Sequence, residues 1–158
     1  MPESRSSASS EETELIAAAL AQNLRGGDVI LLQGDLGAGK TTFVRGAARA
    51  LGVEGVVTSP TFTIGQLYPV TAEPGTTAVG GVRAIAHLDL YRLGSLTAED
   101  PDLLADYVAP DLIAFVEWPL SAEQELAQLG RIAYRVMLEH GGADKRKLTI
   151  EPTPGLSS

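Results

Sequence analysis

Apolar residues recur at helical spacing near the start of the chain. In segment 11–25 they fall every three or four positions, which predicts a helix with one buried face. The pair Gly26-Gly27 follows directly and ends the pattern. The ten residues before this segment are polar and rich in serine, and we expect them to form a flexible tail.

The middle of the chain contains several strand patterns. A continuous apolar run at 29–32 predicts a buried strand, and residues 41–51 after it return to helical spacing. A second apolar run at 112–116 predicts another buried strand, and alternation over 83–91 predicts a third. Segment 58–70 begins with a proline turn and becomes β-branched and aromatic, which is typical of a strand.

The last third of the chain carries a different pattern. Segments 131–138 and 147–151 read as two strands around Gly141-Gly142, which predicts a hairpin. An acidic segment, 96–108, predicts a short helix, and residues 152–158 are expected to be a second flexible tail. Because helix-linked strands and hairpin strands occur together, we expect an α/β fold with a mixed, partly antiparallel sheet flanked by helices.

Composition narrows the class of protein. The chain has 158 residues, which suits one domain, and it has no cysteine for a disulfide or a thiolate metal site. No apolar run approaches the length of a membrane span, so we expect a cytoplasmic protein with no membrane attachment. The net charge of −8 argues against a broad surface that binds nucleic acid, so a partner would do most of any RNA binding.

One glycine-rich motif carries specific chemistry. Gly34, Gly39, Lys40 and Thr41 satisfy the pattern G-x-x-x-x-G-K-[ST] between the predicted strand at 29–32 and the helix that follows. Such a loop points backbone N–H groups at phosphates, its lysine reaches the β- and γ-phosphates, and the hydroxyl binds Mg²⁺. The order of strand, loop and helix therefore predicts a single P-loop domain with a nucleoside triphosphate site.

Two acids at strand ends are candidates for the metal and the attacking water. Glu117 follows the apolar run at 112–116, and Asp89 lies in an alternating strand. The spacing does not rank them by role, since Glu117 could be a solvated acid and Asp89 could form a salt bridge to Arg83 or Arg92. P-loop hydrolases need a carboxylate near Mg²⁺ and a group that orients water.

One further segment and one histidine can each be interpreted in two ways. The hydroxyls of Thr58-Ser59-Pro60-Thr61 could sense the terminal phosphate, or the segment could be a simple proline turn. His87 is expected to pack or hydrogen-bond within its strand rather than take part in chemistry.

Three classes of P-loop protein remain to be compared. A GTPase should carry an Asn-Lys-x-Asp segment, but the only asparagine, Asn23, precedes the loop. A small-molecule kinase fits the size of the chain, although its arginines are scattered and form no tight lid cluster. A nucleotide-gated interaction module is modestly favoured, because little in the chain suggests a pocket for a second substrate.

Four motifs in order resemble a known family. The chain contains GDLGAGKTTF, SPTF, HLDLYRL and VEWP, and EET opens its first helix. Together they resemble TsaE, the bacterial ATPase of the pathway that makes N6-threonylcarbamoyladenosine in tRNA. The resemblance implies weak ATP hydrolysis with Mg²⁺ and association with a TsaB–TsaD pair. In that pathway TsaD modifies adenosine 37 of tRNA, and the ATPase is thought to reset the complex, with tRNA contacted indirectly.

The resemblance also implies roles for individual residues. The cofactor-binding loop falls on Gly37, Ala38, Gly39, Lys40, Thr41 and Thr42. Within it, Lys40 contacts the phosphates and Thr41 the Mg²⁺, while Glu117 becomes the metal-associated glutamate. Asp89 becomes the catalytic or switch acid, and Thr61 the switch-region threonine.

The sequence departs from the family pattern at two places. The loop at 71–81 is longer than is usual in the family. The family's late Gly-Arg pair, near the nucleotide, is met here only by Asp144-Lys145-Arg146.

Overall fold

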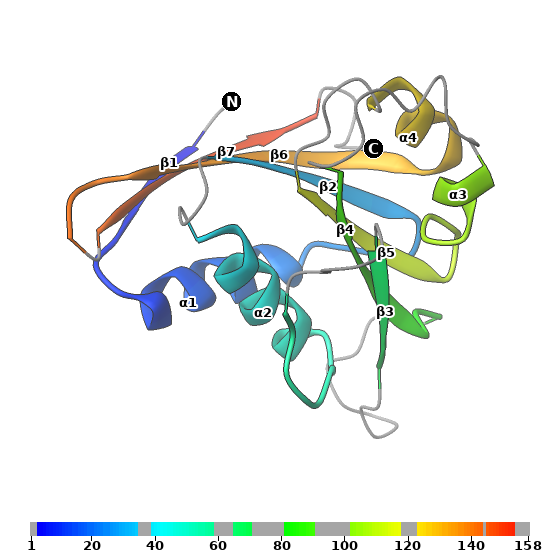
Figure 1. Cartoon of the computed structure of the whole chain (residues 1–158), viewed down its shortest axis with the longest axis horizontal. Helices are drawn as coiled ribbons and strands as arrows, with labels where there is room; N and C mark the ends of the chain where they lie inside the picture. The colour runs from blue at the N-terminus through cyan, green and yellow to red at the C-terminus, as the bar shows by residue number, and fades with distance from the viewer. Residues whose placement is uncertain are drawn as a thin grey trace.

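The computed structural model describes residues 3–34, 39–58, 65–70, 81–90, 102–117, 123–143 and 145–153. In these ranges one seven-stranded mixed sheet runs through the molecule, in the order β1-β7-β6-β2-β5-β4-β3 (Figure 1). The strands are β1 (Glu3–Ser7), β2 (Asp28–Gln33), β3 (Gly65–Pro69), β4 (Ala84–Asp89), β5 (Leu112–Glu117), β6 (Arg131–His140) and β7 (Arg146–Pro152). The helices are α1 (Ser10–Ala21), α2 (Lys40–Ala50), α3 (Asp102–Ala105) and α4 (Glu123–Leu129).

The sheet combines a parallel centre with antiparallel edges. Strand β2 pairs in parallel with both β5 and β6, and β4 pairs in parallel with β5. At the edges, β3 runs antiparallel to β4, and β1 and β6 each run antiparallel to β7. The expected mixed sheet and the β6–β7 hairpin are therefore confirmed, and β5 lies between β2 and β4.

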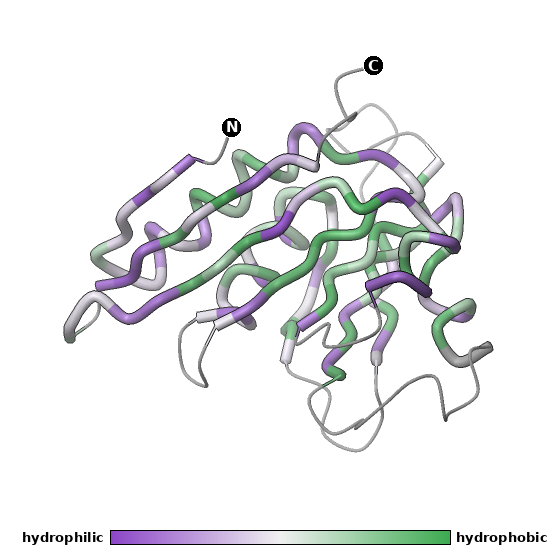
Figure 2. Tube along the Cα trace, turned by 90° about the horizontal axis from the view of Figure 1, so that it is seen from above, coloured by the Kyte–Doolittle hydropathy of each residue, from purple (hydrophilic) through white to green (hydrophobic). Residues whose placement is uncertain are grey.

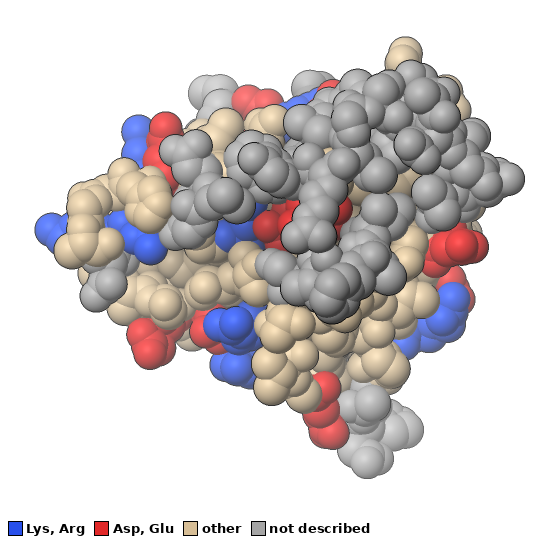
Figure 3. Space-filling model, in the orientation of Figure 1, with Lys and Arg blue, Asp and Glu red and all other residues tan. Residues whose placement is uncertain are grey.

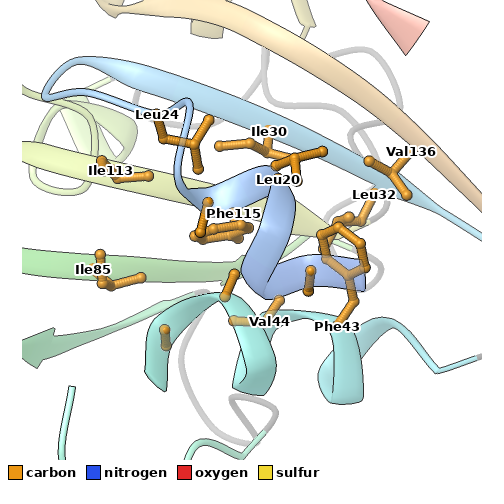
Figure 4. Packing of buried hydrophobic residues seen from close by; sticks show 14 of the residues in the cluster. Leu20, Leu24, Ile30, Leu32, Phe43, Val44, Ile85, Ile113, Phe115 and Val136 are labelled. Carbon is orange, nitrogen blue, oxygen red and sulfur yellow. The ribbon is translucent and has the colours of Figure 1, made fainter. Parts of the chain in front are cut away.

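Helices cover both faces of this sheet. Figure 1 shows α1 and α2 side by side on one face, and α3 and α4 on the other. The larger core lies under α1 and α2, where Figure 4 shows their side chains against the inner strands. In this cluster Phe43 of α2 and Phe115 of β5 are both fully buried.

The central strands explain the continuous apolar runs of the sequence. Both faces of β5 are covered, and all six of its residues are buried. Residues Asp28 to Leu32 of β2 are buried as well. Figure 2 shows this hydrophobic interior, with more hydrophilic segments toward the outer strands. Parallel strands with helices on both sides lose the polar alternation of half-exposed strands.

The N-terminal segment differs from the expectation of a flexible tail. Residues Glu3 to Ser7 form edge strand β1, paired with β7, and only Ser7 of these five is buried. Because the other four side chains face solvent, the strand needs no apolar residues, and the hydrophobic pattern could not reveal it.

The helix boundaries also differ from the predicted ones. Helix α1 ends at Ala21, where the backbone N–H of Gln22 bonds to the carbonyls of Ala19 and Leu20. Leu24 is buried in the connection to β2, so the apolar pattern continues past the end of the helix. Helix α4 was not predicted at all.

The acidic helix predicted at 96–108 is only partly described. Helix α3 covers Asp102–Ala105, and residues 91–101 lie outside the described part. The predicted loop at 71–81 is likewise outside it, except for residue 81.

Candidate phosphate-binding site

The carboxyl ends of three neighbouring parallel strands meet at one edge of the sheet. Strand β2 leads to Gly34, β4 ends at Asp89 and β5 ends at Glu117. In the strand register, Glu117 lies beside Leu32 on one side and Asp89 on the other. Ligands of open α/β sheets bind at this edge.

Helix α2 begins at the same edge with its N-terminal amides uncapped by a side chain. Its N-cap is Gly39, whose φ of 101° lies in the left-handed region that favours glycine. No acidic residue occurs in the first turn, which contains Lys40, Thr41 and Thr42. The N–H groups and the dipole at the start of a helix attract an anion.

Helix α1 provides a useful contrast, because its own residues satisfy its N-terminus. The Ser9 hydroxyl accepts from the Glu12 N–H at 3.1 Å, and the Glu12 carboxylate accepts from the Ala8 N–H at 2.8 Å. The pair is close to a capping box, except that Glu12 accepts from the residue before the N-cap rather than from Ser9 itself. The N-cap of α2 is Gly39, which has no side chain to form such a cap, and a helix start of this kind suits a bound phosphate.

Lys40 is buried at this helix start. The residue is 5% exposed, and its Nζ donates to the Gly34 carbonyl at 2.6 Å. The contact spans the phosphate loop from the end of β2 to the first turn of α2. The lysine of a P-loop motif reaches the β- and γ-phosphates from this position.

Glu117 is also buried, and it contacts residues from two other elements. The residue is 3% exposed, and its Oε2 accepts from His87 Nε2 on β4. Thr41 Oγ1 of α2 lies 3.5 Å from the same oxygen. The interpretation of Glu117 as a merely solvated acid is therefore wrong.

Asp89 lies next to Glu117 in the register of β4 and β5 and is half-buried. Arg83, one candidate for its salt bridge, instead pairs with Asp111 at 2.6 Å. The other candidate, Arg92, is outside the described part of the chain. Since side chains of β4 alternate, Asp89 is on the same sheet face as His87.

Several predicted site residues lie outside the described residues. These are Gly37 and Ala38 of the loop, and Thr61 of the switch segment. Thr58, the first residue of that segment, is hydrogen-bonded to Tyr68 of β3. The Tyr68 hydroxyl accepts from the Thr58 N–H at 3.2 Å and donates to the Thr58 carbonyl at 3.1 Å.

Two residues near the loop escaped the sequence-based assignment. His87 was expected to pack or hydrogen-bond within its strand rather than take part in chemistry. It is fully buried, and its hydrogen bond runs across to Glu117 of β5. Arg146, at the start of β7, comes close to the helix start: its Nε would lie 3.9 Å from a Cβ placed on Gly39. The sequence shows a basic stretch around Arg146, but it does not show that this stretch lies near the phosphate loop. The β6–β7 hairpin brings Arg146 there.

The oxygen atoms at this edge suit a hard divalent cation. At 3.5 Å, the Thr41 hydroxyl and the Glu117 carboxylate are too far apart for a good O–H···O hydrogen bond. Hydroxyl, carboxylate, water and phosphate oxygens are the ligands that Mg²⁺ takes. Among the described residues no group of three or more His, Cys, Asp and Glu forms a metal site.

The strand, the glycine turn and the helix start with its buried lysine define a P-loop fold. The sequence model of the family described as "Threonylcarbamoyl adenosine biosynthesis protein TsaE" matches residues 7–148. The chain therefore belongs to the TsaE family, whose members take part in threonylcarbamoyladenosine biosynthesis in tRNA. Across the described residues, no helix is both long enough and apolar enough to span a membrane.

Individual relatives agree with this assignment. The chain is 38% identical over 141 residues to "tRNA threonylcarbamoyladenosine biosynthesis protein TsaE" of Bacillus subtilis, covering 89% of this chain and 79% of that protein. It is 41% identical over 109 residues to the protein of the same name from Streptomyces coelicolor, covering 69% and 68%. The crystal structure of Bacillus subtilis YdiB superposes with a TM-score of 0.68 and 31% identity, covering 96% of this chain and 86% of YdiB.

Proposed function

We propose that this protein is a Mg²⁺-dependent ATPase with weak intrinsic activity that acts in tRNA threonylcarbamoyladenosine modification. The observation that carries the proposal is the meeting of Lys40, the uncapped start of α2 and the Glu117 carboxylate at one sheet edge. Each of these features alone has structural explanations. Together they provide donors for phosphates next to an acid for a metal.

Different residues of the site are proposed to contact different parts of Mg²⁺-ATP. The backbone amides of Gly37, Ala38, Gly39 and Thr42 would bind the phosphates of ATP. The ammonium of Lys40 would contact the β- and γ-phosphates. Thr41 and Glu117 would hold Mg²⁺, directly or through water, and a bound ion would supply positive charge for the phosphates.

Hydrolysis also requires an oriented water. Asp89 is half-buried beside Glu117, where its carboxylate can accept a hydrogen bond from the attacking water. Thr61 is proposed as the switch-region threonine. The hydrogen bonds between Tyr68 and the backbone of Thr58 connect the start of this switch segment to β3. The chain is proposed to act as one cytoplasmic P-loop domain.

We further infer that the protein works with a TsaB–TsaD complex and that ATP hydrolysis resets this complex. The relatives' names support a place in the tRNA modification system. Figure 3 shows Lys, Arg, Asp and Glu mixed over the described part of this face, where they form no broad basic surface. With a net charge of −8, the chain is better suited to reach tRNA through its partners than by direct contact.

The proposal is tested by measuring ATP hydrolysis by the purified protein alone, then with a TsaB–TsaD pair and tRNA. We expect slow Mg²⁺-dependent phosphate release that the partners change, and no release by Lys40→Ala. Consumption of ATP that depends on an added metabolite, with a phosphorylated product, would instead support the small-molecule kinase. Equal hydrolysis by the wild type and Lys40→Ala would remove the P-loop from the reaction.

A further inference from the structure

His87 is an unusual residue for its place in the fold. It lies in the buried part of β4, between Ala86 and Leu88, and its exposed fraction is 0%. Its strand neighbours and Phe115, its register partner on β5, are all buried apolar residues. An apolar side chain would satisfy this position without the cost of burying an imidazole.

The polar atoms of His87 have one partner among the described residues. Nε2 contacts Glu117 Oε2, while Nδ1 is buried and has no hydrogen-bond partner in the described ranges. Because a carboxylate only accepts, Nε2 carries the hydrogen and donates. The polar function of His87 in this structure is therefore its bond to Glu117.

This bond acts on the same carboxylate oxygen that approaches Thr41. Both described contacts use Glu117 Oε2, one from β4 and one from the start of α2. A glutamate has three side-chain torsions to fix, whereas a histidine inside a central strand is held by its packing. His87 thus fixes the orientation of the Glu117 carboxylate relative to the Thr41 hydroxyl.

We propose that His87 is a positioning residue that orients Glu117 for Mg²⁺. The inference rests on the proposed function, in which Glu117 serves the metal. Residues that hydrogen-bond to a metal ligand without touching the metal orient that ligand. Their removal commonly lowers metal affinity by about 10- to 100-fold. A purely structural His87 would instead affect folding and leave the Mg²⁺ dependence of nucleotide binding unchanged.

Two amide substitutions separate these roles. In His87→Gln the side-chain NH₂ can reach the place of Nε2 and donate to Glu117, whereas the shorter side chain of His87→Asn cannot. Ile85→Val, at a buried position two residues earlier on the same face, controls for altered packing of β4. The measurement is the affinity for a fluorescent ADP analogue across a Mg²⁺ titration and in EDTA, with the melting temperature of each apo protein.

For His87→Asn we expect the apparent Mg²⁺ affinity to fall about 10-fold or more, with ADP affinity in EDTA unchanged. His87→Gln and Ile85→Val should both keep a Mg²⁺ dependence near that of the wild type. In a Glu117→Gln background, His87→Asn should cause no further loss, because its effect passes through Glu117.

Equal Mg²⁺ titrations for the wild type, His87→Gln and His87→Asn would overturn the inference and leave the proposed function standing. A loss of the same size in Ile85→Val would also overturn it, since packing alone would then explain the effect. If the wild type shows no Mg²⁺ effect on nucleotide affinity, the proposed function fails, and the inference fails with it.

Discussion

Single residues of the site differ in how far the sequence can identify them. Lys40 and Thr41 are set by one local motif, so their roles can be predicted from spacing alone. Glu117 and Asp89 can be selected as strand-end acids, but spacing does not rank them. The contact between His87 and Glu117 joins positions 30 residues apart, and it depends on which strands are neighbours. Only the structure reveals it.

The first prediction concerns Asp89. Asp89→Asn keeps the size of the side chain but removes the carboxylate that is proposed to orient water. We expect nucleotide affinity to stay near the wild-type value while the rate of hydrolysis falls about 100-fold or more, the scale of a lost catalytic acid or base. Equilibrium binding and single-turnover hydrolysis provide the two measurements. Unchanged hydrolysis would exclude Asp89 from catalysis.

Glu117→Gln should behave differently, because Glu117 is proposed to serve the metal. We expect binding of the ADP analogue in EDTA to persist and its gain on addition of Mg²⁺ to be largely lost. A Mg²⁺ titration of nucleotide binding measures this directly, with Glu54→Gln, at an exposed position after α2, as the control. A wild-type Mg²⁺ response in Glu117→Gln would contradict the assignment.

At the scale of elements, the site depends on how closely α1 and α2 approach. A Cβ added to Gly46 of α2 would lie 2.4 Å from the backbone oxygen of Glu14 on α1. The two helices therefore cross where one of them has no side chain. Because α2 begins at Lys40, its position on the sheet also sets the position of the phosphate loop.

Gly46→Ala tests this crossing. Helix propensity alone predicts a gain of about 1 kcal/mol from replacing a helical glycine by alanine. Overpacking against a backbone that cannot move aside costs about 1–3 kcal/mol, so we expect a net loss of stability. Urea unfolding at equilibrium provides the measurement. A more stable Gly46→Ala protein would show that the helices can separate without cost.

Strand β1 leads to a second prediction at this scale. Beyond its pairing with β7, its last residue, Ser7, is buried and shares a 2.7 Å hydrogen bond with Thr13 of α1. Deleting residues 1–7 should therefore lower the melting temperature by several degrees, the shift expected for about 1–2 kcal/mol in a domain of this size. An unchanged melting temperature would restore the interpretation of this segment as a flexible tail.

At the scale of the whole molecule, the apolar patterns predicted most of the fold. The buried strands, the P-loop helix and the late hairpin each have a pattern of apolar residues that can be recognised from the local sequence alone. Edge strand β1 and helix α4 were missed, since exposed or short elements need little apolar periodicity. Strand order could not be predicted, and it is strand order that brings β4 and β5 together beside β2.

The interaction with partners is also a property of the whole molecule. If hydrolysis resets a complex, the chain must bind TsaB–TsaD differently in its ATP and ADP states. We expect co-purification with the pair to be stronger with a non-hydrolysable ATP analogue than with ADP, and to be lost in Lys40→Ala. Equal recovery under all conditions would mean that nucleotide does not control assembly.

The central claim is that the loop between β2 and α2 holds ATP, and equilibrium binding of ATP tests it most directly. Isothermal titration of the wild type and Lys40→Ala with Mg²⁺-ATP should show a single site in the first protein and a large loss of affinity in the second. The two proteins should have the same fold by circular dichroism. Absent binding in a folded wild type, or equal affinity in both proteins, would contradict the claim.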